Sequence, residues 1–165
     1  MRKIEVDYGH FELVARRDPY EGSNGIQGEA YLDLETGEVI WIHEERIDSD
    51  GNRYIDWGSD ITTDESAVQA NREARTHVAS DHARFLELPY LDHREAFEEF
   101  VNLVNVPGVE YNDSYGGYLA GIRQNHGYDA FCSMRDNWNH FKVGASVERL
   151  QDYVRKEGGV EPVLK

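Results

Sequence analysis

The single cysteine of the chain, Cys132, is the first residue whose chemistry can be weighed. A cysteine becomes a nucleophile when a nearby base or a helix N-terminus stabilises its thiolate, and His126 and His140 lie close to it in the sequence. No protease signature surrounds Cys132, and the segment 129–134 is an apolar helical stretch of the kind that buries a free cysteine. We therefore expect Cys132 to pack in the core rather than to catalyse a reaction.

Three histidines, His77, His82 and His93, carry imidazole groups that suit zinc, nickel or iron. His77 and His82 are five positions apart, so on a helix they point to different faces, unlike the i, i+4 pair of a zinc motif. One cysteine cannot supply a thiolate site either. We expect solvated or helix-capping histidines, and we predict neither a metal nor a cofactor.

The segment 48–52, Asp-Ser-Asp-Gly-Asn, places acidic and amide oxygens around a glycine, as a calcium-binding loop does. With Gly51 in the sixth position of such a loop, Arg46 would take the first and Trp57 the twelfth, where carboxylates are required. Asp-Gly is also a favoured two-residue reversal between strands. The segment therefore predicts a hairpin turn instead of a calcium site.

Motifs of the common enzyme classes are absent from the sequence: it contains no G-x-G-x-x-G, no Walker A, no G-x-S-x-G and no H-E-x-x-H. Carboxylates are so numerous that no pair can be selected for acid–base catalysis. We expect a protein without catalytic activity, and we assign no catalytic residue. A hydrolase that uses Cys132 or a carboxylate cluster is kept as an alternative.

Acidic residues dominate the charge of the chain, with 32 Asp and Glu against 17 Lys and Arg and a net charge of −15. They concentrate in residues 29–65, where twelve acidic residues face only two arginines. Such a surface repels a phosphate backbone, and it attracts and steers a basic protein. We therefore expect a basic protein as the partner and no direct binding of nucleic acid.

Eight residues of this acidic region are predicted to form an interaction face in which aromatic side chains are surrounded by charge. They are Trp41, Glu44, Glu45, Asp48, Asp50, Tyr54, Asp56 and Trp57. Aromatic anchors ringed by charge are typical of interface centres, although tryptophan and tyrosine are also well buried on average. We expect a non-enzymatic interaction module that presents this acidic face. The alternative is an acidic mimic of nucleic acid that inhibits a DNA- or RNA-binding protein.

The composition is that of a folded globular protein. A length of 165 residues is typical of one domain, and 39% hydrophobic residues can supply its core. The apolar runs, such as residues 39–42, are far shorter than the ~20 residues of a membrane span, and residues 1–5 lack a signal peptide's apolar stretch. We expect one domain over residues 1–165, located in the cytoplasm and away from membranes. The composition leaves the oligomeric state open.

Two turns that contain glycine predict the hairpins that carry the interaction face. Residues 30–34 and 39–43 are runs of strand-forming residues on either side of the first turn, and residues 45–48 and 53–57 flank the second. Residues 84–88, before a proline, predict a fourth short strand. Together these runs predict an antiparallel meander of three to four strands, with one face against helices.

Helical periodicity and capping signals account for the rest of the chain. They predict helices over residues 8–15, from a capping box at 62–65 to about residue 80, from a second capping box at 92–95 to residue 104, and over residues 115–124, 128–141 and 147–157. Apolar residues from Phe97 to Val104 recur at i, i+3, i+4 and i+7, which indicates a core helix. The sequence predicts an α+β fold with a helical C-terminal third.

Several short motifs occur in an order that is found elsewhere. They are residues 30–40, residues 85–89 followed by 97–101, and Ala130-Phe131 followed by Arg135-Asp136. In these motifs the chain resembles an uncharacterised bacterial protein family (UPF0158) over most of residues 7–160. The resemblance implies the same α+β order and implies no reaction or cofactor. Cys132-Ser133 stands where that family has a basic pair, and Asp129 where it has a second glycine, so a basic patch expected in the family is weakened.

Overall fold

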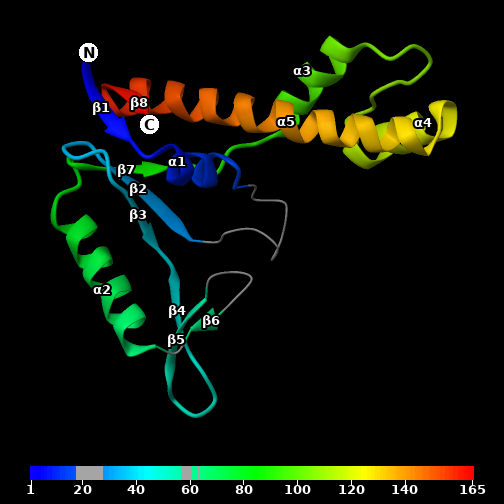
Figure 1. The fold of residues 1–165 in the computed structure, drawn as a ribbon. Helices are drawn as coiled ribbons and strands as arrows, with labels where there is room; N and C mark the ends of the chain where they lie inside the picture. Colours follow the sequence, from blue (N-terminus) through cyan, green and yellow to red (C-terminus); the bar gives the residue numbers. More distant parts are fainter. Residues whose placement is uncertain (18–27, 57–60, 63) are drawn as a thin grey trace. The chain divides into compact units, whose positions relative to one another are not determined.

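The computed structural model describes residues 1–17, 28–56, 61–62 and 64–165 (Figure 1). In chain order the elements are β1 (Arg2–Val6), α1 (Tyr8–Ala15), β2 (Glu29–Asp33), β3 (Val39–Ile42), β4 (Glu44–Ile47), β5 (Arg53–Asp56), β6 (Ile61–Thr62), α2 (Glu65–Ser80), β7 (Phe85–Leu88), α3 (Arg94–Val104), α4 (Tyr115–His126), α5 (Tyr128–Tyr153), the π-helical turn η2 (Val154–Gly158) and β8 (Val160–Leu164). The predicted α+β fold class, with small antiparallel sheets and a helical C-terminal region, is confirmed.

The chain forms two compact units, and each is described by itself. The first unit contains residues 1–91 and 149–165, and the second contains residues 92–148. The boundary between the units therefore falls inside α5. The single domain predicted from the sequence stays a prediction.

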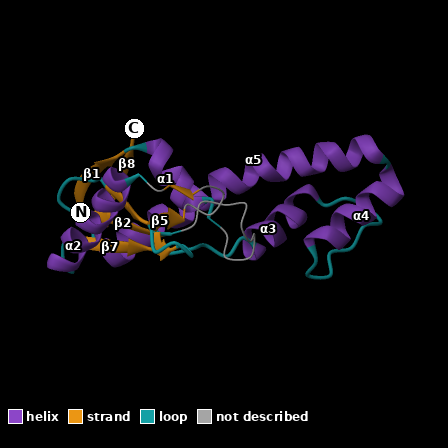
Figure 2. Cartoon of the chain, turned by 90° about the horizontal axis from the view of Figure 1, so that it is seen from below, coloured by secondary structure: helices purple, strands orange, loops and turns teal. Residues whose placement is uncertain are grey.

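The strands that the structure describes all belong to the first unit, and Figure 2 shows them in orange. One antiparallel sheet has the strand order β3-β2-β7, and a second has the order β4-β5-β6. The third sheet is a parallel pair, β1 with β8, in which Arg2 lies opposite Val160 and Val6 opposite Leu164. The two predicted hairpins and the predicted strand at 84–88 are confirmed.

The single meander expected from the sequence is divided into two sheets at His43, the residue between β3 and β4. At this position the backbone is bonded to a side chain of α2 instead of a strand. The His43 N–H donates to Oδ1 of Asn71 at 2.8 Å, and Nδ2 of Asn71 donates to the His43 carbonyl at 2.9 Å. The buried carboxamide of Asn71 thus bonds the backbone groups that a neighbouring strand would otherwise bond, and it holds α2 against the chain at His43.

The turn between β2 and β3 is fixed by a buried carboxylate and a glycine. Asp33 accepts backbone hydrogen bonds from Glu35 and Thr36, and its two oxygens bind Arg84 at 2.9 and 2.8 Å. Gly37 has φ +80°, and a Cβ built on it would lie 1.9 Å from the carbonyl oxygen of Glu5 in β1. Only glycine combines this dihedral angle with this close approach.

Three helix boundaries differ from those predicted. At the predicted capping box 92–95, α3 begins after His93, which makes no side-chain capping bond, while Oδ1 of Asp92 accepts from the Arg94 N–H. Helix α2 is capped by Asp64, whose side chain accepts from the Ser66 N–H, so the cap lies two residues beyond the predicted Thr62. The predicted helices over residues 128–141 and 147–157 are joined in α5 and η2. In the joining segment Ser146 donates to the carbonyl of Lys142, which keeps the hydroxyl satisfied within the helix.

The terminal strands β1 and β8 were not predicted. β1 alternates apolar and charged residues over only its last four positions, β8 has a single charged residue, and each strand needs the other as its partner. Backbone bonds from Tyr8 N to Lys165 O and from Lys165 N to Val6 O extend the pairing. Pairing between the two ends of the described chain has no local sequence signal, which is why it was missed.

Each unit has its own core. Unit one buries Phe11 and Val14 of α1 together with Ala30 and Leu32 of β2, and all four have a fractional exposure of 0%. The second unit, helical in Figure 2, gathers Phe97, Phe100, Tyr118 and Trp138 with their neighbours, so the predicted core helix α3 is confirmed. Among the described residues, no helix is both long and apolar enough to cross a membrane.

Candidate interaction site

The hairpin of β4 and β5 carries most of the predicted interaction residues. Its strands pair antiparallel, with Glu44 opposite Asp56 and Ile47 opposite Arg53. The loop closes through bonds from Asp48 N to Asn52 O at 2.9 Å and from Gly51 N to Asp48 O at 3.1 Å. The loop therefore spans three residues rather than the predicted two, with Gly51 at φ +82° in its last position.

Asp48 has a structural role in this loop. Its Oδ1 accepts hydrogen bonds from the backbone N–H of Asp50 at 2.9 Å and of Asn52 at 2.8 Å. These bonds fix the loop conformation and leave the negative charge at the end of the hairpin. Asp48 thus combines turn formation with the surface charge expected of it.

One face of the hairpin is tied to α2 through Glu45. Glu45 binds Arg53 across the hairpin at 2.9 Å and binds Arg72 of α2 with nitrogen–oxygen distances of 2.5 and 3.0 Å. Ile55, which lies opposite Glu45, is 1% exposed. Glu45 therefore positions the base of the hairpin and is not an isolated surface charge.

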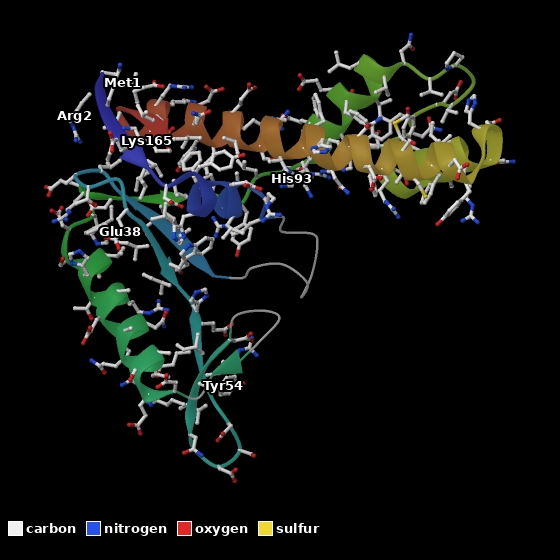
Figure 3. All side chains as sticks on the ribbon, in the orientation of Figure 1. Met1, Arg2, Glu38, Tyr54, His93 and Lys165 are labelled. Carbon is white, nitrogen blue, oxygen red and sulfur yellow. The ribbon has the colours of Figure 1, made fainter. Side chains whose placement is uncertain are left out.

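The other face of the hairpin is also paired. Arg46 binds Glu44 at 3.0 Å and approaches Asp56 at 3.4 Å. The hydrogen bond to Glu44 and the charges of Glu44 and Asp56 raise the pKa of the Arg46 guanidinium. Tyr54 lies opposite Arg46 and is half-buried. Figure 3 labels Tyr54 on the hairpin.

Charge and apolar surface remain together at the end of the hairpin. Ile47 is 64% exposed, and Asp50, three positions further along in the loop, is exposed and forms no ion pair within the described part of the chain. We define Ile47, Asp48 and Asp50 as the hairpin tip. The acidic face predicted from the sequence is thus concentrated at this tip, because arginines neutralise most of the carboxylates behind it.

A cavity of about 840 Å³ lies between the loop of the hairpin and the first half of α2. It is lined by residues 51–53 of the hairpin and by Glu65, Val68, Gln69 and Arg72 of the helix. Its lining is largely polar, and it lies beside Arg53, the residue that pairs with Ile47 across the hairpin.

Of the two tryptophans of the predicted face, only Trp41 belongs to the residues that the structure describes. Trp41 lies in β3, in the other antiparallel sheet, where its ring is 5.5 Å from the Arg17 guanidinium and stacks beside His43. Trp57 lies outside the described residues. The hairpin therefore assembles Glu44, Glu45, Asp48, Asp50, Tyr54 and Asp56, and the sequence reasoning missed its most exposed apolar residue, Ile47.

Arg17 is a buried cation that the sequence did not indicate. It is 4% exposed, donates to the carbonyls of Gly28 at 2.7 Å and Leu88 at 2.9 Å, and lies 4.1 Å from the centre of the Tyr90 ring. Burial lowers the pKa of its guanidinium. These contacts connect α1 to β7, so Arg17 has a structural role.

The residues weighed for catalysis or metal binding are not brought together. Cys132 is half-buried on α5, and no histidine within the described ranges is hydrogen-bonded to it. His77 packs edge-on against Phe85, at 4.8 Å between ring centres. No group of three potential metal ligands gathers anywhere in the described structure.

One serine–histidine pair escaped the sequence analysis. Ser146 Oγ lies 3.2 Å from Nδ1 of His93 and donates to the Lys142 carbonyl at 2.6 Å. Ser146 is 0% and His93 5% exposed, so no substrate can reach the hydroxyl in this conformation. The pair joins the start of α3 to α5 inside the second unit.

Comparison of the chain with protein-family models, with curated proteins and with solved structures found no match. The resemblance to the uncharacterised bacterial family therefore stays an expectation.

Proposed function

We propose that the protein is a non-enzymatic interaction module whose docking element is the β4–β5 hairpin. The observation that carries this proposal is the 64% exposure of Ile47 beside the charges of Asp48 and Asp50. A large aliphatic side chain at the end of a fixed hairpin exposes apolar surface that a partner can bury. The flanking carboxylates select a partner with basic groups around an apolar pocket.

The ion pairs behind the tip support docking as a preformed element. Glu45 joins the hairpin to α2 through Arg72, and Asp48 holds the loop through two backbone bonds. A preorganised element loses less conformational entropy on binding than a flexible one. The arginine pairs also interrupt the acidic residues, which favours docking at the tip over mimicry of a continuous phosphate backbone.

A capture experiment tests this proposal. The tagged protein is incubated with native lysate at about 0.15 M and about 0.5 M salt, where screening separates electrostatic from apolar binding. We expect one specific partner, with basic groups on the surface that contacts the tip, whose capture falls at the higher salt. Capture should also be lost in the combined variant Ile47→Ser, Asp48→Asn and Asp50→Asn, because the tip then loses its apolar side chain and both charges. The asparagine introduced at position 48 keeps a side-chain oxygen that can accept the two loop bonds.

The matched control removes the same number of charges from the base of the hairpin. The variant Glu44→Gln with Asp56→Asn loses two carboxylates that pair with Arg46 and leaves the tip unchanged. It should capture the partner as the unmodified protein does. Equal loss in both variants, or no specific partner at either salt, would contradict docking through the tip.

A further inference from the structure

An arginine–aromatic surface lies at the corner between α4 and α5 in the second unit. Tyr128 and Phe131 stack with ring centres 6.0 Å apart and an angle of 26°. The guanidinium of Arg123 lies 5.4 Å from the first ring and 6.0 Å from the second, and that of Arg135 lies 5.7 Å from Phe131. We define these four residues as the arginine–aromatic surface.

The corner is held in one conformation by its backbone. Gly127 ends α4 at φ +94°, its N–H donates to the Arg123 carbonyl at 2.9 Å, and its carbonyl accepts from the Phe131 N–H at 3.1 Å. Stacking of the guanidinium on the rings restricts the Arg123 side chain. The surface is therefore largely formed before any partner binds.

This surface offers both apolar area and unused hydrogen-bond donors. Tyr128 is 59% exposed, and Arg123 is exposed without an ion pair among the described residues. Arg135 is paired only loosely, at 3.8 Å to Asp136 with both side chains solvated. A guanidinium stacked on a ring keeps its edge N–H groups available for a carboxylate. The chemistry that fits is an apolar side chain flanked by carboxylates.

The hairpin tip has that chemistry, and we infer that the partner of the tip is a second copy of this chain. Ile47 would pack on Tyr128 and Phe131, while Asp50 would pair with Arg123. Complementary charge around an apolar contact is what the two surfaces share. This inference rests on the proposed function of the tip, and it names the surface that the tip contacts.

The net charge of −15 per chain opposes the association of two copies, and salt weakens this repulsion. At physiological ionic strength the Debye length is about 8 Å, so most charges of two associated copies are screened from each other. The proposed contact between the carboxylate of Asp50 and the guanidinium of Arg123 is shorter than this length and is screened less. Association should therefore be measurable at about 0.15 M salt and weaker at about 1 M salt.

Sedimentation equilibrium of the full chain tests the inference. Between about 1 and 100 µM, the range of weak specific affinities, we expect the average mass to rise above the 19.0 kDa of the monomer. Arg123→Glu should weaken association about tenfold or more, since it replaces attraction by repulsion. Lys156→Glu is the control, because it makes the same charge change at another exposed cation without an ion pair among the described residues.

A charge exchange identifies the two surfaces as partners. Asp50→Arg should also weaken self-association about tenfold or more, because two cations then meet at the contact. In a mixture of the Asp50→Arg and Arg123→Glu proteins, the two changed residues can pair with each other, and the unchanged Asp50 of one protein can pair with the unchanged Arg123 of the other. The mixture should therefore associate more strongly than either protein alone. Circular dichroism of each variant checks that folding is retained.

The outcomes separate this inference from the proposed function. A mass of 19.0 kDa at all concentrations, equal weakening by Lys156→Glu, or no recovery in the mixture would overturn self-association. If a different basic partner is still captured through the tip, the proposed function stands and only the identity of its partner was wrong. If capture through the tip also fails, both are refuted.

Discussion

Asp33 shows how one buried carboxylate organises the sheet that lies beside the interaction hairpin. It is 2% exposed and binds Arg84 through both oxygens while it closes the β2–β3 turn. The hydrogen bonds from Arg84 are the main cause that holds the pKa of Asp33 well below its ordinary value of 3.8. Asp33 therefore stabilises the folded state in its charged form.

Replacing Asp33 with Asn should lower the free energy of unfolding by about 2 kcal/mol at pH 7, since charge-assisted hydrogen bonds are lost and Arg84 keeps partial access to water. The folded pKa is lower than the unfolded pKa, so this contribution is full above pH 3.8 and is lost as the pH falls below it. Urea denaturation of both proteins at pH 7, 5 and 3 measures the difference. A gap that stays constant down to pH 3 would contradict the assigned role of Asp33.

Comparing Gly37 with Gly51 separates two costs of adding a Cβ: the steric clash with a neighbouring strand and the strain of a positive φ. Both have positive φ, +80° and +82°, but a Cβ on Gly37 meets the Glu5 carbonyl at 1.9 Å whereas a Cβ on Gly51 meets nothing. Gly51→Ala should cost about 1 kcal/mol from the dihedral angle alone. Gly37→Ala should cost about 3 kcal/mol or more, since β1 must also move. Equal losses in urea denaturation would refute the close packing of β1 on this turn.

At the scale of elements, α2 holds the break between β3 and β4 in place. Asn71 is 7% exposed and binds both backbone groups of His43. Asn71→Ala should lower the free energy of unfolding by about 2 to 3 kcal/mol, because two buried backbone groups lose this partner. The exchange rate of the His43 amide hydrogen should rise with it.

The control for this prediction is Gln69→Ala on the same helix. Gln69 is exposed and contacts only Glu73 among the described hydrogen bonds, at 3.3 Å, so the change should stay within about 0.5 kcal/mol. A similar cost for both variants would mean that the carboxamide of Asn71 does not fix the sheet boundary.

Local patterns predicted the elements better than their arrangement. Alternating apolar residues and glycine turns were enough to predict the hairpins around Gly37 and Gly51, since each signal lies within a few residues. The division at His43 depends on Asn71, 28 positions away, and the pairing of β1 with β8 joins strands from opposite ends of the chain. Contacts of this kind leave no periodic pattern in the sequence.

The candidate site was predicted in the same partial way. The acidic residues of the hairpin were found from composition, but their pairing with Arg46, Arg53 and Arg72 was not. Arg72 is 27 positions from Glu45, so only the folded structure brings it there. The exposure of Ile47 was missed for the same reason, because an isoleucine in a strand is usually buried.

At the scale of the whole molecule, the charge of −15 is not spread as an undivided acidic surface. Arginines neutralise the base of the hairpin and a separate arginine–aromatic surface lies on α4 and α5. The hairpin belongs to the first unit, and the arginine–aromatic surface belongs to the second. The two surfaces thus carry complementary charge around exposed apolar side chains.

The most direct test of this account is a photo-crosslink from the hairpin tip. A photoreactive amino acid is placed at Ile47 in one protein and at Leu103, which is similarly exposed at 66%, in another. The account predicts that position 47 crosslinks to residues of a basic and apolar surface on the partner. If the partner is a second copy, these residues lie within 123–135. Position 103 should give no matching adduct. No adduct from position 47, or the same adducts from both positions, would contradict docking through the hairpin.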